Sequence, residues 1–206
     1  GGGLTLTGNF VVDGGTIKLD GNYPTGTNNV AMGDTALASG SLSGGCNTAI
    51  GFASLNANTS ASKNTGLGAC ALAKNTTGAE NIGIGFLAGA CNTEGNNNAS
   101  LGVQALRINT TGDNNVALGS YALNKNETAD NNTAVGFNSI CSNTTGAENT
   151  AVGSSALTSN TTGFNNSALG RCALFSNTEG DKNTAIGMST LRCNLTGCSN
   201  TAVGYT

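Results

Sequence analysis

A glycine recurs at every seventeenth position along most of this 206-residue chain, and this period constrains the fold more than any other feature. Ten glycines keep the spacing: Gly51, Gly68, Gly85, Gly102, Gly119, Gly136, Gly153, Gly170, Gly187 and Gly204. The interval from Gly33 to Gly51 is longer by one position, so the first repeat holds one additional residue. A repeat of this length is too short for a pair of helices and does not follow a heptad, but it suits stacked β-coils.

Two asparagine positions keep the same period. Numbered from its glycine, each coil has the consensus G-x-x-A-L-x-x-N-T-T-G-x-x-N-T-A-V. Position 14 is Asn29, Asn47, Asn64, Asn81, Asn98, Asn115, Asn132, Asn149, Asn166, Asn183 and Asn200, and position 8 is Asn58, Asn75, Asn92, Asn109, Asn126, Asn143, Asn160, Asn177 and Asn194. Stacked asparagines can bond one another along a fibre, and asparagine also tolerates left-handed turns. We therefore expect both positions to stack at turns.

Two further positions are apolar in nearly every coil. Position 5 is Leu55, Leu72, Leu106, Leu123, Ile140, Leu157, Leu174 and Leu191, with Gly89 as the exception; position 17 is Ile50, Leu67, Ile84, Leu101, Leu118, Val135, Val152, Leu169, Ile186 and Val203. Position 16 is always Ala, Gly or Ser. Neighbouring residues of a strand point to opposite faces. We expect positions 5 and 17 to face each other inside a flat coil, and the small residues at position 16 to contact another chain.

These patterns predict an all-β protein, a parallel β-solenoid whose coils each hold two short strands and two turns. About ten coils, stacked at roughly 4.8 Å, would form a rod roughly 50 Å long. The glycines at position 1, and usually at position 11, would supply the backbone freedom that turns require. Because a single rod buries little apolar surface, we expect three identical rods around a common axis, with a dimer as the alternative.

The sequence divides into two regions. Residues 29–206 hold the repeats, whereas residues 1–28 lie outside them and alternate like strands at 4–7, 10–12 and 16–19, with an Asp13-Gly14-Gly15 turn signal. We expect a β-rich lead-in that caps or connects the roll. The chain begins with glycine instead of methionine and stops within a repeat, so we expect it to be one portion of a longer protein.

Composition argues against several classes of function. The net charge is −3 and the eight Lys and Arg residues are scattered, so no basic stripe is present for nucleic acid. The longest apolar stretch, residues 82–91, is too short for a membrane span. Histidine is absent, which removes the commonest general base and both Ser-His and Cys-His dyads. We expect no enzymatic activity, cofactor or metal site.

Two groups of polar residues have both a structural and a functional interpretation. The acidic residues lie mostly at positions 9 to 13, as Glu94, Asp113, Glu127, Asp130, Glu148, Glu179 and Asp181 do. They indicate a solvated turn, with weak calcium or saccharide binding as the alternative. Seven position-8 asparagines begin an N-x-S/T sequon: Asn58, Asn75, Asn109, Asn126, Asn143, Asn160 and Asn194. Because Asn92 and Asn177 keep the position without a sequon, we favour turn chemistry over glycosylation.

The seven cysteines do not have the spacing of a metal site. Cys70 and Cys91 have the same separation in sequence as Cys172 and Cys193, and each pair joins position 3 of one coil to position 7 of the next. A disulfide within each pair, or a bridge between chains, is the alternative to small, semi-apolar filling residues.

The repeat resembles sequences of known fibres. Residues 149–163, Asn-Thr-Ala-Val-Gly-Ser-Ser-Ala-Leu-Thr-Ser-Asn-Thr-Thr-Gly, and their copies resemble the head repeats of YadA-like trimeric autotransporter adhesins. The Ala-Leu and Asn-Thr-Thr-Gly elements are more similar still to repeats of phage tail fibres, including those of marine cyanophages, and of giant-virus fibres, and residues 15–24 resemble lead-in segments of the phage fibres. The resemblance covers about residues 29–206 and implies a trimeric, left-handed parallel β-roll.

The expected function follows from this resemblance. It implies an extracellular structural and adhesive fibre on a virion or a bacterial surface, with a cell-surface receptor, which could be a glycan, as the partner. A bacterial adhesin head is one alternative to a phage or viral fibre shaft. Ice binding is another, because Thr48, Thr65, Thr133, Thr150, Thr184 and Thr201 share position 15, although Ile82, Ala99, Val116 and Ser167 interrupt the row.

Overall fold

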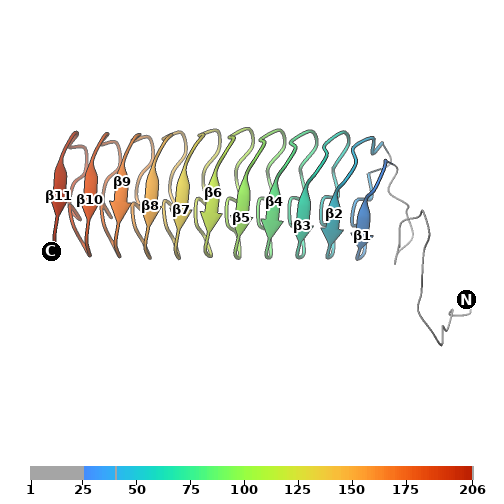
Figure 1. Cartoon of the computed structure of the whole chain (residues 1–206), viewed down its shortest axis with the longest axis horizontal. Coiled ribbons are helices and arrows are strands. Elements are labelled where there is room, and N and C mark those ends of the chain that lie inside the picture. The colour runs from blue at the N-terminus through green and yellow to red at the C-terminus, as the bar shows by residue number, and fades with distance from the viewer. Residues whose placement is uncertain (1–25, 40, 206) are drawn as a thin grey trace, which may run out of the picture.

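The computed structural model describes residues 26–39 and 41–205, and this part of the chain is one row of stacked coils (Figure 1). Eleven strands of three residues form a single parallel sheet in chain order. The strands are β1 (Val30–Met32), β2 (Thr48–Ile50), β3 (Thr65–Leu67), β4 (Ile82–Ile84), β5 (Ala99–Leu101), β6 (Val116–Leu118), β7 (Thr133–Val135), β8 (Thr150–Val152), β9 (Ser167–Leu169), β10 (Thr184–Ile186) and β11 (Thr201–Val203). Equivalent residues pair between coils, as Thr133 does with Thr150. The predicted parallel β-solenoid is confirmed.

The predicted lead-in at residues 1–28 lies outside the described residues except for residues 26–28.

Each described coil contains one strand, so the prediction of two strands per coil was wrong. In the coil that begins at Gly153, positions 3, 5 and 13 are Ser155, Leu157 and Asn165, with φ values of 57°, 52° and 57°. Residues in this left-handed region interrupt an extended strand. The backbone on that side still bonds between coils, as the Leu157 amide does to the Ala173 carbonyl at 2.9 Å. The second side is therefore a stacked series of turns.

Both asparagine columns lie inside the solenoid and bond as predicted. The backbone amide and Nδ2 of Asn149 donate to Oδ1 of Asn132 at 2.9 and 3.2 Å, and its Nδ2 also donates to the Gly163 carbonyl at 2.8 Å. Asn160 Nδ2 donates to Asn143 Oδ1 at 2.9 Å and to the same carbonyl at 2.8 Å. Neither column uses the left-handed backbone that asparagine tolerates, which occurs instead at neighbouring position 13.

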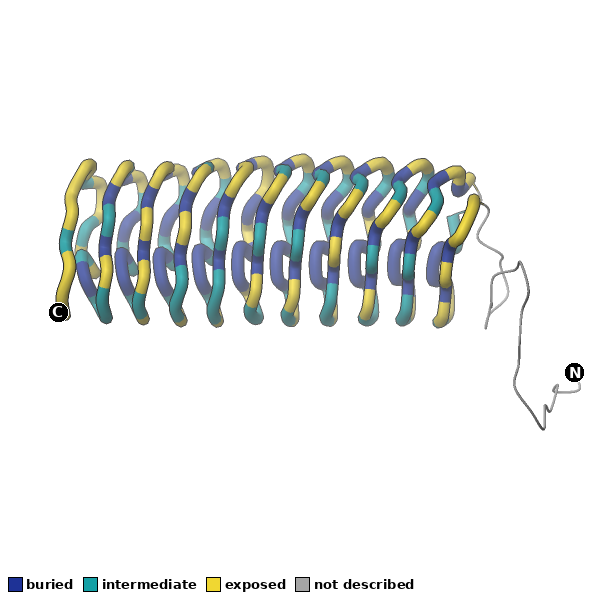
Figure 2. The backbone as a smooth tube through the Cα atoms, viewed as in Figure 1, coloured by how far each residue is buried: buried dark blue, intermediate teal, exposed yellow. Residues whose placement is uncertain are grey.

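The apolar interior is formed by positions 4, 5 and 16. Leu123, Ala122 and Ala117 are fully buried, and the same three positions repeat along most of the row. Position 17 points outward instead of inward, because Val135 and Val152 are half-buried and Leu118 is 38% exposed. The tube in Figure 2 alternates accordingly between buried and more exposed residues along the strands. Two predictions are therefore wrong, since position 17 is outside and the small residues at position 16 fill their own core. The narrow interior already holds the leucine column and accepts only small side chains opposite it.

The repeat glycines at positions 1 and 11 differ in backbone conformation. Gly136, at position 1, has a φ of 129°, and a Cβ there would lie 2.7 Å from the carbonyl oxygen of Gly153. Gly163, at position 11, does not have a positive φ, but its Cβ would lie 2.5 Å from Asn160 Oδ1 and 2.5 Å from the Gly180 carbonyl oxygen. Position 1 therefore needs both conformational freedom and space. Position 11 is crowded at Gly163, although Ala61 and Ala129 occupy the same position in other coils.

The assignment of inside and outside predicts unequal effects of two leucine truncations. Leu123→Ala removes a fully buried side chain and should lower the free energy of unfolding by about 2–5 kcal/mol. Leu101→Ala, at a side chain that is 48% exposed, should cost less than about 1 kcal/mol in the isolated chain. Urea unfolding at a dilution where sedimentation shows a monomer measures both, and equal losses would contradict the assignment.

The asparagine columns predict a large effect of a nearly isosteric change. Asn149→Asp places a carboxylate oxygen against Asn132 Oδ1 and the Gly163 carbonyl, so the unfolding free energy should fall by about 3–5 kcal/mol at neutral pH. Burial without a cation raises the pKa of the introduced carboxyl, so the loss should shrink as the pH falls below that raised pKa. The control Asn165→Asp, at an exposed left-handed position, should be nearly neutral. Similar losses in both variants would contradict this role.

Candidate interaction face

Positions 15 and 17 of β1–β11 form what we call the outer sheet face. Position 15 is Val30, Thr48, Thr65, Ile82, Ala99, Val116, Thr133, Thr150, Ser167, Thr184 and Thr201, and position 17 is Met32, Ile50, Leu67, Ile84, Leu101, Leu118, Val135, Val152, Leu169, Ile186 and Val203. None of these residues is charged, and in every strand the central residue is the most buried. The outer sheet face of one chain is therefore continuous, uncharged and mostly apolar.

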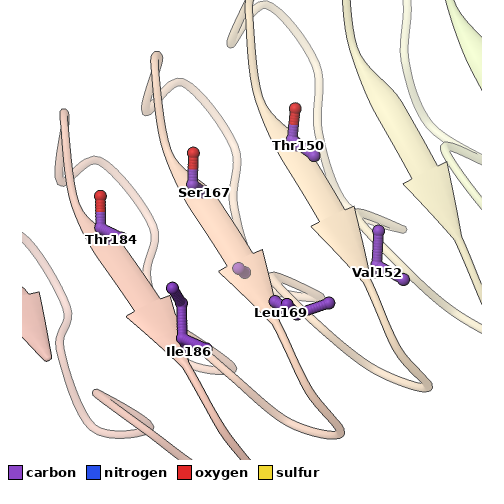
Figure 3. Close-up of a pocket in the computed structure, with 7 residues that line it drawn as sticks. Thr150, Val152, Ser167, Leu169, Thr184 and Ile186 are labelled. Carbon is purple, nitrogen blue, oxygen red and sulfur yellow. The ribbon is translucent and has the colours of Figure 1, made fainter. Parts of the chain in front are cut away.

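The outer sheet face is grooved around β8, β9 and β10. Around β8, β9 and β10 the hydroxyls of Thr150, Ser167 and Thr184 form one row and the side chains of Val152, Leu169 and Ile186 form the other (Figure 3). The groove between them has a volume of about 310 Å³, and none of the residues that line it is charged. Such a surface suits the side-chain ridges of another apolar face better than a charged small ligand.

Apolar residues continue past the end of the strands. The chain bends at position 1, and position 2 then carries Phe52, Phe86 and Phe137, which are 55%, 50% and 54% exposed, and Val103, which is 40% exposed. Tyr121 packs edge-on against Phe137 with ring centroids 6.1 Å apart. Large exposed apolar side chains are therefore concentrated at positions 15, 17 and 2, and an exposed patch of this extent commonly marks an interaction site.

Charged residues lie mainly away from this face. The acidic residues at positions 9 to 13 lie on the turn before the strand, where Asp113 Oδ1 accepts from the Asn96 amide at 2.6 Å and Asp130 Oδ1 accepts from the Asp113 amide at 2.7 Å. Lys63 and Glu80 form an exposed ion pair of 2.7 Å, which raises the Lys63 pKa through the hydrogen bond to that carboxylate. The aspartates thus cap backbone amides of the preceding coil.

The predicted sequons and disulfides can be placed directly. Asn143 and Asn160 are fully buried and donate through Nδ2, the atom that a glycan would occupy, which supports their structural interpretation.

All seven cysteines, none of which lies outside the described residues, are unpaired. Burial raises the pKa of the Cys141 thiol, with the Lys125 ammonium opposing the shift, so this thiol is protonated at neutral pH and a weak nucleophile.

Residues 26–39 and 41–205 contain no group of three or more His, Cys, Asp or Glu side chains that could hold a metal ion. Within the same residues, no helix has the length and apolarity needed to cross a bilayer.

Comparison with protein-family models, curated proteins and solved structures found no match to this chain. Any functional proposal therefore depends on the geometry and chemistry of its own residues.

The predicted ladder residues form real columns, but not all in the expected place. The asparagines at positions 8 and 14, the position-1 glycines and the position-5 leucines stack inside or at the turns, whereas Val135 and Val152 belong to the outer sheet face. Sequence reasoning did not single out this face. The signal was available, because bulky apolar residues gather at positions 2, 15 and 17 while charge is absent from positions 15 and 17.

The unpaired cysteines predict a simple chemical result. A freshly purified chain, denatured without reductant, should yield seven titratable thiols per chain with a disulfide-exchange reagent. Five thiols, together with a peptide joining Cys70 to Cys91 or Cys172 to Cys193, would contradict the unpaired state. A sample denatured after reduction supplies the reference value.

Proposed function

We propose that this chain is a segment of a structural and adhesive fibre, in which three copies pack side by side as left-handed rolls through their outer sheet faces. The observation that carries the proposal is the uncharged, mostly apolar face that runs over all eleven strands. Bulky aliphatic side chains such as Leu101 and Leu169, 48% and 50% exposed, gain stability only when something covers them.

The repeat favours a second copy of the same chain as the partner. A partner for this face must match two rows of side chains that recur with every coil along eleven strands. Another copy has the same rise per coil, so its ridges stay matched along the whole length. A surface with a different repeat would lose that match after a few coils.

The extent of the face is sufficient for a specific interface. Taken together with the adjoining position 2, eleven strands at about 4.8 Å, with a width of roughly 10–16 Å, give about 500–800 Å² per chain. Stable complexes bury about 800 Å² per partner. The face is therefore of the right order, and a closed ring lets each chain use it against two neighbours.

Three copies suit this surface better than two. Position 2 lies beyond the bend at position 1, so a flat pairing of two sheets would leave Phe52, Phe86 and Phe137 uncovered. Closure around a threefold axis brings the edge of each chain against its neighbour and covers these rings. A dimer in solution would contradict this part of the proposal.

A rigid rod of this kind suits attachment. Coil-to-coil hydrogen bonds run the length of the described chain, and the exposed turns repeat the same polar groups at short intervals. Such a rod can hold a receptor-binding tip away from a virion or cell surface, or make shallow, repeated contacts with a cell-surface glycan. The absence of histidine also favours a structural role over a catalytic one.

A charge on the outer sheet face should prevent assembly. Leu118→Lys would bury three like charges around the axis and should weaken association at least about 100-fold while leaving the monomer folded. The control Thr145→Lys, on an exposed turn, introduces the same charge and should assemble normally. Light scattering after size exclusion gives the mass, and negative-stain images give the rod. A monomeric unmodified chain, or normal assembly of Leu118→Lys, would overturn the proposal.

Ice binding is the second candidate, since β7–β11 present an outward row of hydroxyls from Thr133, Thr150, Ser167, Thr184 and Thr201. The parallel row of bulky aliphatic residues at position 17 disfavours it. Thermal hysteresis of the isolated chain, lost on changing Thr150 and Thr184 to Lys, would favour this alternative.

A further inference from the structure

The outer sheet face is not uniform along the rod. Position 15 carries a hydroxyl in β2 and β3 and again in every strand from β7 to β11, but Ile82, Ala99 and Val116 make it apolar in β4, β5 and β6. Position 17 is apolar in these three strands as well. We call β4–β6 on this face the apolar block. A smaller interruption occurs at Val30 of β1, at the end of the row.

The interior is weakest at β3–β5, which overlaps the apolar block at β4 and β5. Gly66, Gly83 and Ser100 replace the usual alanine at position 16, and Gly89 replaces the leucine at position 5. The buried apolar residues accordingly form two separate clusters, one from Ala31 to Leu72 and the other from Ala105 to Ala185. Leu72 reaches into the space at Gly89, where a Cβ would lie 2.7 Å from its Cδ2 atom. The coils of β4 and β5 therefore combine reduced apolar packing inside with an apolar outer face, whereas the β6 coil keeps Ala105, Leu106 and Ala117 inside.

A perfectly repetitive face cannot define how far along the axis two copies are aligned. If every coil were alike, sliding one chain by a single coil would restore nearly all contacts, apart from those lost at the ends. The order of residues at position 15 removes that equivalence. A slip of one coil sets Val30 beside Thr48, Thr65 beside Ile82 and Val116 beside Thr133, so apolar side chains meet hydroxyls.

We propose that the apolar block is the register-setting element of the self-association described above, with the β4–β6 block of a second copy of this chain as its partner. The inference rests on the proposed fibre function and adds which coils align the chains. The block of one copy lies against the block of the next, and that contact covers the outer side of β4 and β5, where Gly83, Gly89 and Ser100 reduce the internal apolar packing. Sliding by a coil exposes or mismatches part of the block, so the aligned assembly is favoured.

Photo-cross-linking tests the register. A benzophenone amino acid replaces Ser154, an exposed residue at position 2, and the cross-linked peptides of the assembled full chain are mapped by mass spectrometry. The otherwise unmodified chain should cross-link within a single coil of its partner. The triple variant Ile82→Thr, Ala99→Thr, Val116→Thr gives position 15 hydroxyls throughout β2–β11, and its cross-links should spread to the equivalent sites of the neighbouring coils.

A matched variant separates register from general surface damage. Ile82→Val with Val116→Ile also alters the block but keeps it apolar, and should retain a single cross-linked coil. The triple variant should stay folded, because each substitution copies a residue type that neighbouring coils already hold at position 15 and threonine is favourable in strands. If circular dichroism nevertheless shows it unfolded, Ile82→Thr alone serves, with a smaller displaced fraction expected.

The outcomes separate the two proposals. A single unshifted cross-link in an assembled triple variant would overturn the register role and leave the fibre proposal standing. Loss of assembly in that variant would show that the apolar block contributes to the strength of association instead of the register, and would also overturn the register role. A monomeric unmodified chain would overturn both proposals together.

Discussion

The buried asparagine columns impose the strictest condition on this fold. A primary amide inside a protein must find partners, and the column asparagines find them mainly in the coil before and in the turn beside them, as Asn149 does at Asn132 Oδ1 and the Gly163 carbonyl. The buried Nδ2 of Asn132 is an exception among the described residues, since it has no hydrogen-bond partner. An additional residue that shifted an asparagine out of its column would leave side-chain amides without hydrogen bonds. The additional residue in the first repeat does not have this effect, because the Asn47 backbone amide still donates to Asn29 Oδ1 at 2.8 Å. The period is therefore a hydrogen-bonding requirement as much as a packing one.

That requirement allows strain to be repeated in every coil. Leucine at position 5 has a φ near 50°, and Ile140, which is β-branched, has 47° there, although such residues rarely enter the left-handed region. Each instance costs of the order of 1–3 kcal/mol. The leucine column and the backbone bonds between coils offset that cost only when neighbouring coils are in place. Stability in this chain therefore resides in the contacts between coils, and a single coil has little of its own.

Only part of this fold could be predicted from the sequence. The period, the parallel stacking and the asparagine columns were predictable, because each follows from a residue recurring at one spacing. The absence of a second strand was not predictable, because leucine rarely adopts a positive φ and the sequence gives no sign that Leu157 does so. The side that faces inward was also undetermined. Alternation separates Ala134 from Val135, but both are apolar, and only the width of the coil decides that the alanine is inside.

This reversal of inside and outside changes what the chain requires from its surroundings. If the larger aliphatic residues faced inward, they would fill the core of a single rod. Only the narrow row of small residues at position 16 would then remain for contact with a neighbouring chain. With Ala134 inside and Val135 outside, the core stays small and the larger apolar surface remains on one face. Coils with glycine at an inward position, such as Gly83 and Gly89, lose still more internal packing. Apolar burial in such a coil can increase only from outside. Folding uses the inward face of each strand, and the proposed assembly would use the opposite, outward face.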